Sequence, residues 1–508
     1  MPNRDTIAWG ALVLAAVLLL RLPAFWTPIL DVDEAQFAGY ADWLLHGGLP
    51  YVSSVDTKPL GIYWFFAAVF AIFGRNDMIA VHVVTAFWVA ATALFCYLIA
   101  RDLGSRRAGF FAALFYAVFT TTYVPKFIST SIVVVMMLPL SASVYCVLLW
   151  ERTRRMRWML VAGLLWGAAC LFKYQAGINL FVVAGYLMIA RPLMLRGSGV
   201  RWKETLVFLG GGAAVGGLFA LYLLSIGVWD DFVFWSFRGS AAYIEAGARL
   251  IGFWKNLGVR GGLFVASSLL VWILAGISVA RFVRGRSKFS AAEYLVPIWL
   301  ALSLVAVCTG GKFYGHYFIQ LLPPLCIMAG LAAARLRRGW LVAVAAGMII
   351  PAAGFFGARL YAGKIYDALG EEDPNSYRPI AERVEAITEE GDTIFVWGFA
   401  TPVYYFSDRL GASRFLWCDW LTGRAPGTPQ AKDPEFDTTE FITAGSWEML
   451  FEDFEINEPA VIVDTSPGDH HDYGKYPIDS YPKLRDYLKS HYRLVERVDG
   501  ADIYERLR

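Results

Sequence analysis

The sequence predicts an all-α membrane domain of about eleven transmembrane helices, followed by a small α/β domain. Of the 508 residues, 57% are hydrophobic and only 17% are charged, which leaves too few polar side chains to cover a soluble protein of this size. The apolar residues also come in repeated runs of about 20 residues, the length that crosses a bilayer. Both observations indicate an integral membrane protein.

The charge distribution places the boundary between the two domains near residue 357. Residues 1–357 contain 29 Lys and Arg against 14 Asp and Glu, whereas residues 358–508 contain 16 against 29. The acidic balance of the C-terminal region argues against nucleic-acid binding. Only Cys418 of the six cysteines lies in that region, so we expect neither a disulfide framework nor a cysteine-rich metal site.

Short hydrophilic breaks rich in Arg and Lys alternate with less basic breaks along the membrane domain. The five basic breaks hold 18 Lys and Arg, and the positive-inside rule places them in the cytoplasm. The N-terminus is then cytoplasmic, and the C-terminal domain lies outside the cytoplasm of a multi-pass protein of the plasma (inner) membrane. The five basic breaks cover residues 101–107, 151–157, 191–203, 281–288 and 335–338.

Residues 59–73 decide this topology because they are apolar enough to suggest a twelfth span. Counting them as a span would reverse every later loop and place all five basic breaks outside. The segment is short for a crossing, and Trp64, Phe65 and Phe66 suit a membrane interface. We therefore expect a helix that lies at the outer face.

The C-terminal region predicts an α/β domain because helical and strand patterns alternate along it. We expect two helices, two short buried strands, a terminal strand pair and a loop rich in Pro, Gly and Thr. These are, in the same order, residues 377–390 and 482–491, 393–397 and 460–464, 493–506, and 423–437.

The first outer loop, residues 27–58, collects charge against the membrane. Asp31, Asp33 and Glu34 stand near its start, and Asp56 and Lys58 stand at its end. Such acids and a lysine can converge over a lipid headgroup. Lys58 also precedes a proline, which favours the first turn of a helix, and a lysine beside free helix N–H groups suits a phosphate.

Structural roles remain open for the same residues. Asp31 with Glu34, or Asp33 with Gln36, is a plausible capping box for the helix that follows. Lys58 could be an anchor that extends to the interface. The helix itself has apolar residues at i, i+3, i+4 and i+7 spacing, which suits a helix lying on the bilayer surface. These residues are Phe37, Tyr40, Ala41 and Leu44.

Several motifs, taken in order, resemble the bacterial branch of the GT-C glycosyltransferases. That branch is related to the protein O-mannosyltransferases and to the lipid A aminoarabinose transferase. The resemblance covers about residues 7–357 and extends through the order of the spans. The motifs are Arg21, Asp33-Glu34, Lys58-Pro59-Leu60 with Tyr63, residues 163–173 (GLLWGAACLFK) and residues 312–324 (KFYGHYFIQLLPP).

The resemblance implies a GT-C-like fold and transfer of a sugar from a polyprenyl-phosphate donor to an acceptor on the extracytoplasmic face, with inversion. Asp33 matches the acid that acts on the acceptor hydroxyl, and Glu34 would orient Asp33 or meet the acceptor. Lys58 matches the lysine that holds the donor phosphate. Elementary chemistry agrees, because a sugar hydroxyl needs a base and a departing phosphate needs a fixed cation.

Further residues near the outer ends of spans are candidates for substrate contact. We expect a second phosphate or sugar contact from Lys312 and His316, with Lys173 a weaker candidate of the same kind. The alternative is an interfacial belt of aromatic and lysine side chains. Asp56, Tyr63 and Tyr314 complete the predicted substrate-binding set.

Because of departures from the family pattern, a second acidic metal ligand is doubtful, so we predict no cofactor and leave a divalent metal as the open alternative. Many relatives carry an acid after the second outer loop, where this chain has Ser129, Thr130 and Ser131. Thr57 replaces an acid beside the lysine, and Gln36 replaces an arginine of the aminoarabinose transferase. An Asp-His-His-Asp run at 469–472 suggests a solvated loop more than an ion site. Five aromatic residues could stack on sugars, although core packing suits most of them: Trp397, Tyr404, Tyr405, Trp417 and Trp420.

The leading hypothesis is a membrane glycosyltransferase that uses a polyprenyl-phosphate sugar and a glycan, lipid or protein acceptor. A transporter or flippase of lipid-linked sugars is the alternative, but such proteins place ionisable residues near the midplane of their spans. A third hypothesis is an outer-face binding protein with a degenerate site. The sequence names neither the sugar nor the acceptor, because a few pocket contacts set specificity.

Overall fold

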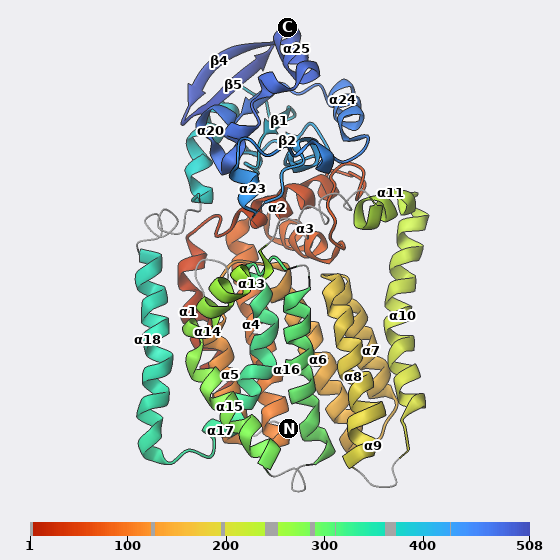
Figure 1. Cartoon of the computed structure of the whole chain (residues 1–508), viewed down its shortest axis with the longest axis vertical. Helices are drawn as coiled ribbons and strands as arrows, with labels where there is room; N and C mark the ends of the chain where they lie inside the picture. The colour runs from red at the N-terminus through yellow and green to blue at the C-terminus, as the bar shows by residue number, and fades with distance from the viewer. Residues whose placement is uncertain are drawn as a thin grey trace.

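A computed structural model describes residues 4–122, 128–194, 199–238, 252–284, 290–309, 311–360, 372–426 and 428–507. A bundle of helices carries an α/β domain at one end, and the N-terminal helix begins near the opposite end (Figure 1). The bundle contains α1 (Arg4–Arg21), α4 (Met78–Leu103), α5 (Arg106–Phe119), α6 (Ile132–Thr153), α7 (Arg157–Cys170), α8 (Asn179–Gly185), α9 (Arg191–Met194), α10 (Trp202–Ser225), α14 (Gly262–Ser267), α15 (Leu269–Arg284), α16 (Leu295–Cys308), α17 (Leu322–Ala333) and α18 (Leu341–Leu360).

The helices of the bundle account for the spans that the sequence predicts. Within the described residues, seven helical segments are long and apolar enough to cross a membrane. Phe253–Ser267 and Leu269–Arg284, which bend by 89° at their junction, make an eighth if they form one span. The shorter helices α5, α7 and α16 pack among the long ones, at the positions of the remaining predicted spans.

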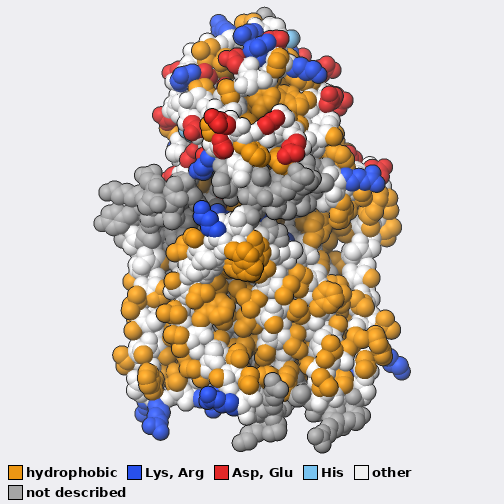
Figure 2. Space-filling view, viewed as in Figure 1, with side chains coloured by type: hydrophobic (Ala, Val, Ile, Leu, Met, Phe, Trp, Pro, Cys, Tyr) orange, Lys and Arg blue, Asp and Glu red, His pale blue; other side chains and the backbone are white. Residues whose placement is uncertain are grey.

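Contacts between the breaks reproduce the predicted alternation. Three contacts join basic breaks at the end away from the α/β domain: Arg152 with Asp102 at 2.5 Å, Arg191 with Glu151 at 3.0 Å, and Arg107 with the Leu336 carbonyl at 3.5 Å. Lys and Arg side chains are visible along that edge, below a belt of hydrophobic side chains (Figure 2). Four of the five basic breaks therefore meet at one end of the bundle, and residues 285–288 of the fifth lie outside the described residues.

Two helices of the first outer loop region lie between the bundle and the α/β domain. They are α2 (Val32–Leu45) and α3 (Gly61–Phe73), both at the end that carries the α/β domain (Figure 1). The 13 residues of α3 extend about 20 Å at 1.5 Å per residue, well short of the roughly 30 Å hydrocarbon core. The prediction that residues 59–73 do not span the membrane is confirmed.

The apolar face of α2 packs against protein, so the prediction that this helix rests on the bilayer is wrong. Tyr40 stacks on Tyr63 of α3 with ring centroids 3.8 Å apart, and Phe37 contacts the same ring edge-on. On its other side Gly39 faces the α/β domain so closely that a Cβ would lie 3.2 Å from Leu416. One core of buried apolar side chains continues from α2 and α3 into the sheet. We call α2, α3 and the α/β domain together the cap.

The α/β domain is built on a five-stranded sheet of order β2-β1-β3-β5-β4. Its parallel part consists of β2 (Leu410–Gly411), β1 (Thr393–Trp397) and β3 (Val461–Asp464). The hairpin of β4 (Tyr492–Val498) and β5 (Ala501–Arg506) extends the sheet in antiparallel fashion. The helices are α20 (Arg378–Ala386), α21 (Pro402–Ser407), α22 (Asp419–Thr422), α23 (Pro429–Lys432), α24 (Ser446–Asn457) and α25 (Pro482–His491).

Most predicted elements of this domain are present, with a few differences. The strands at 393–397 and 460–464, the helix at 482–491 and the terminal hairpin are confirmed. The helix predicted over 377–390 ends at Ala386, after which the chain turns into β1. The predicted loop at 423–437 contains the single turn α23, and β2 and α24 have no counterpart among the predicted elements.

Candidate active site

The start of α2 places Asp33 at the junction between the bundle and the cap. Asp31 is the N-cap of α2, and its Oδ1 accepts a hydrogen bond from the Asp33 backbone N–H at 3.2 Å. Asp33 lies in the first helical turn with a partly exposed side chain, where the helix dipole favours a negative charge. The capping box is not completed, because Glu34 accepts from the Leu30 N–H instead, at 2.7 Å.

Glu34 points into the bundle and is buried, with 1% of its surface exposed. Its Oε1 accepts from the Thr130 backbone N–H at 2.6 Å and lies 3.1 Å from Nε2 of His82 on α4. Burial alone would raise the pKa of Glu34, but His82 and the backbone donors hold it below its ordinary value. These contacts are those of an anchor that ties α2 to the bundle, whereas we predicted a catalytic role.

Arg21 belongs to the same buried group of charges at the end of α1. Its Nη1 donates to the carbonyl of Ile128 at 2.8 Å. His82 is held from its other side, with Nδ1 2.7 Å from the carbonyl of Ala24. The motif residue Arg21 therefore supports the wall beside Asp33, and Thr130, where relatives carry an acid, supplies a backbone donor to this group.

Lys58 is held at the end of the loop by a buried carboxylate. Its Nζ lies 2.6 Å from Oδ2 of Asp56, and the same oxygen accepts from Gln36 at 2.6 Å and from the Tyr63 hydroxyl at 2.5 Å. Asp56 is 1% exposed and Tyr63 is fully buried, whereas 31% of the Lys58 side chain is exposed. Asp56 and Tyr63 thus position the lysine from behind, although we predicted that they contact substrate.

Backbone contacts fix the loop on both sides of Lys58. Tyr51, with a φ of 63°, donates from its hydroxyl to the Lys58 carbonyl at 2.9 Å. The first N–H of α3, that of Gly61, donates to the carbonyl of Leu171 at 2.8 Å, and a Cβ at this position would lie only 2.6 Å from that oxygen. This N–H is therefore used within the protein, which corrects our expectation that it is free for a phosphate.

A second group of predicted residues lies on the segment that leads into α17. Tyr314 and His316 have nearly parallel rings 6.1 Å apart, and both contact Tyr317. The Lys173 ammonium lies over the Tyr317 ring, 3.6 Å from its centroid. Lys312 precedes this aromatic group, and its carbonyl accepts from Arg260 at 3.0 Å. The structure thus brings the segment together with the loop that follows α7.

Electrostatic interactions link these groups into one cluster of Lys58, Lys173 and Lys312, which we call the lysine cluster. Burial, with the Lys58 charge acting in the same direction and Asp33 opposing it, lowers the pKa of Lys173 to about 7. Burial also lowers the pKa of Lys312, and Lys58 acts in the same direction. Lys58 repels both Lys173 and Lys312, and Asp33 interacts with Lys173, an arrangement suited to an anion and an adjacent base.

Some participants were missed or undervalued from the sequence. Gln36 and His82 hold the two buried carboxylates, and no local pattern predicts either contact. Trp417 of the α/β domain lies over Lys58, with its ring centroid 5.9 Å from Nζ. Trp417 was one of five aromatic residues considered for sugar stacking, whereas Trp397 and Tyr404 are buried in the core as expected.

The 469–472 run turns toward Glu372 and the rest of its own domain. The backbone N–H of His471 donates to Glu372, and Nδ1 of His470 lies 3.5 Å from the same carboxylate. Asp472 lies 3.2 Å from Lys432. Across the part of the chain that the structure describes, no group of three or more His, Cys, Asp and Glu side chains could hold a metal ion. Metal independence stays a prediction.

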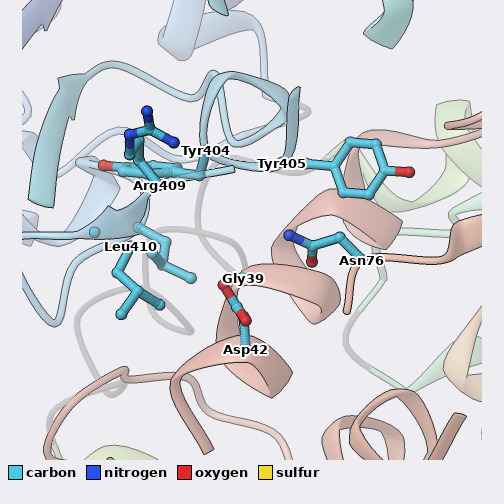
Figure 3. Close-up of a pocket in the computed structure, with 9 residues that line it drawn as sticks. Gly39, Asp42, Asn76, Tyr404, Tyr405, Arg409 and Leu410 are labelled. Carbon is cyan, nitrogen blue, oxygen red and sulfur yellow. The ribbon is translucent and has the colours of Figure 1, made fainter. Parts of the chain in front are cut away.

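A small pocket lies in the cap, away from Asp33 (Figure 3). It is lined by Asp42 of α2, about 13 Å along the helix from Asp33, and by side chains of the α/β domain. Beside it Arg75 donates to both oxygens of Asp42 at 2.8 Å and to Asp408 at 3.1 Å. Asn76 also donates to Asp408, at 2.6 Å. This feature is a clasp between α2 and the α/β domain.

The architecture defines the class of protein. A bundle of transmembrane helices, two short helices across one end, an acid and lysines on the loops of that end, and an α/β domain above them form a GT-C glycosyltransferase fold. The chain resembles ArnT in its fold, and part of it matches the mannosyltransferase family model described below.

The comparisons with known proteins are as follows. Residues 57–216 match the family model described as dolichyl-phosphate-mannose-protein mannosyltransferase. ArnT from Cupriavidus metallidurans, solved bound to undecaprenyl phosphate, is similar in structure with a TM-score of 0.64 and 15% identity over 98% of both chains. The Archaeoglobus fulgidus oligosaccharyltransferase AglB, solved with an inhibitory peptide and a dolichol phosphate, has a TM-score of 0.52 and 13% identity over 100% of this chain and 75% of its own. No curated protein matches the chain by sequence.

Proposed function

We propose that this protein is a membrane glycosyltransferase that moves a sugar from a polyprenyl-phosphate donor to an acceptor hydroxyl, with inversion. The observation that carries the proposal is the lysine cluster beside Asp33, at the bundle end that the cap covers. Undecaprenyl phosphate in ArnT and dolichol phosphate in AglB support a polyprenyl phosphate as the anionic ligand. By the positive-inside rule this end faces away from the cytoplasm.

The reaction needs one base and one cationic site. Asp33 accepts the proton of the acceptor hydroxyl while that oxygen attacks the anomeric carbon of the donor sugar. The bond from the anomeric carbon to the phosphate oxygen breaks on the opposite face, so the configuration inverts. The products are the glycosylated acceptor, polyprenyl phosphate and protonated Asp33.

The lysine cluster acts on the leaving group. A phosphodiester with one negative charge becomes a phosphate monoester that gains a second charge as the bond breaks. Lys58, fixed by Asp56 in a partly buried site, therefore stabilises the transition state more than the bound donor. Lys173 and Lys312 add cationic groups, and the bound phosphate relieves the repulsion of each by Lys58.

The test uses pure protein in proteoliposomes with a panel of polyprenyl-phosphate sugars, and products are identified by mass spectrometry. Asp33→Asn removes the base and Lys58→Ala removes the cation, and we expect each to lower transfer about 100-fold or more. Asp486→Asn and Lys489→Ala on the exposed face of α25 are matched controls that should transfer at the wild-type rate. Full transfer by both site variants would refute the proposal.

A transporter or flippase of lipid-linked sugars remains the competing function. The buried ionisable groups Arg21, Glu34 and His82 lie where α1 ends and α4 begins, beside the first outer loop, and not at mid-span. Transporters concentrate such groups near the midplane. Movement of donor lipid across the vesicle membrane without any covalent product would favour the transporter.

A further inference from the structure

We infer that the segment Trp417–Pro426 of the α/β domain is a working part of the donor-phosphate site, and that Trp417 is the positioning residue for Lys58. This inference rests on the proposed function and deepens it. The α/β domain then contributes directly to the reacting centre, although it lies some 360 residues after Lys58 in the chain.

Trp417 and Phe37 flank the Lys58 ammonium from the two parts of the cap. The ammonium lies 5.9 Å from the Trp417 ring centroid and 5.7 Å from that of Phe37 on α2. These are cation–π distances, and the third restraint is the Asp56 carboxylate at 2.6 Å. Because a lysine side chain has four flexible bonds, two rings and one carboxylate together restrict it to one direction. Without Trp417 only the α2 side of this arrangement remains.

The same segment also meets the second lysine loop. The Tyr314 hydroxyl donates to the carbonyl of Pro426 at 3.0 Å, which docks the segment around Lys312 onto the α/β domain. Asp419 favours the charged form of Lys312 and is itself held by Arg424 at 3.2 Å and by the Tyr473 hydroxyl at 2.9 Å. This ten-residue segment therefore restrains Lys58 and favours the charged form of Lys312, which are two of the three lysines in the cluster.

Positioning and simple structural support make different predictions. If Trp417 positions Lys58, its loss mainly weakens the interaction that strengthens as the leaving phosphate gains charge, so kcat falls while the KM for the donor changes little. If Trp417 only stabilises the cap, its loss lowers the fraction of folded protein and leaves the kinetics of the folded fraction unchanged.

The first experiment measures transfer by full-length protein in nanodiscs, normalised to folded protein. We expect Trp417→Ala to lower kcat at least tenfold with a donor KM within threefold of wild type, and Trp417→Phe to retain at least a third of kcat. Phe451→Ala is the control, because Phe451 is a partly buried aromatic residue of the same domain whose ring neighbours are Trp447, Phe454 and Tyr487. It should be destabilised without a change in kcat.

The second experiment reads the position of Lys58 without catalysis. A water-soluble amine-acylating reagent is applied to donor-free protein, and the modification of Lys58 is compared with that of the exposed Lys489 by peptide mass spectrometry. We expect Trp417→Ala to raise the relative modification of Lys58 at least threefold, and Phe451→Ala to leave it unchanged.

The outcomes separate this inference from the proposed function. Wild-type kcat and wild-type Lys58 labelling in Trp417→Ala would overturn the inference, while a loss of transfer in Lys58→Ala would leave the proposed function standing. Full transfer by Lys58→Ala would instead remove the function on which the inference rests. A fall in kcat with increased labelling of Lys58 supports both.

Discussion

The two ends of the first outer loop are anchored to different parts of the molecule. At the Asp33 end, Glu34 binds His82 of α4 and the Thr130 backbone, so the start of α2 is tied to the bundle. At the Lys58 end, Asp56 binds Gln36 and Tyr63, and Trp417 covers the lysine, so this end belongs to the cap. Each anchor is a carboxylate that is 1% exposed.

The proposed base and the phosphate-binding lysine are nevertheless both tied to α2, because Asp33 lies on this helix and Gln36, three residues later, holds Asp56 and through it Lys58. Glu34, beside Asp33, fixes the start of α2 on the bundle. The cap fixes Lys58. Removing the partner of a buried charge costs far more stability than removing the partner of an exposed charge. Mutations at the two buried anchors should therefore destabilise the protein more than a mutation at the clasp.

The largest effect is expected from the bundle anchor. Glu34→Ala leaves the His82 ring, the Thr130 N–H and the Leu30 N–H without their buried acceptor, so we expect a loss of about 3–5 kcal/mol of stability. Thermal or denaturant unfolding in detergent measures it. Glu452→Ala, at a carboxylate that is 66% exposed, should change stability little. Equal effects of the two variants would contradict the anchoring role.

A pH dependence separates Lys173 from Lys58. Because burial and Lys58 lower the pKa of Lys173 to about 7, its ammonium is lost as the pH rises through 7, and a bound anion favours the protonated form. Affinity for a phosphodiester donor, whose own charge is constant over this range, should therefore fall up to about tenfold between pH 6 and pH 8. Lys173→Arg keeps its charge and should flatten the profile. Isothermal titration at several pH values tests this, and an unchanged slope in that variant would count against Lys173.

The smallest effect is expected from the clasp between α2 and the α/β domain. Arg75→Ala removes a bidentate contact to Asp42 and one bond to Asp408, which is 47% exposed. We expect a loss of about 1 kcal/mol in stability, because the arginine is itself partly solvated. Transfer activity of the folded protein should stay within twofold of wild type. A larger loss of activity would show that the clasp holds the site as well as the interface.

The fold was largely predictable because the length of the apolar runs and the distribution of Lys and Arg between them are local features of the sequence. The spans, the placement of residues 59–73 outside the membrane and the strand at 393–397 all follow from local patterns. The environment of α2 could not be predicted in this way. The apolar residues of α2 have the same spacing in a helix that faces lipid and in one that faces protein. Protein surrounds this face because the α/β domain, which is distant in the sequence, packs in the same core. The two-residue β2 is too short to leave a pattern.

The candidate site was predictable in its residues and less so in their contacts. Asp33, Lys58 and Lys312 lie at one end of the bundle, as their places on alternating loops indicate. The sequence predicted a catalytic role for Glu34 and substrate binding for Asp56, and it gave no sign of their side-chain partners. Their partners, His82 and Gln36, come from helix packing, which a single sequence does not display.

The continuous core shared by α2, α3 and the sheet has a consequence for biosynthesis. The Ile29 carbonyl accepts from Asn375, and Val55 donates to Arg414, so residues near the start of translation find their partners more than 340 positions later. The first outer loop must wait, already translocated, until the last domain has emerged and folded onto it. A chain whose synthesis stops before the last domain therefore lacks the Trp417 ring that lies beside Lys58, and only Asp56 and Phe37 restrain that side chain.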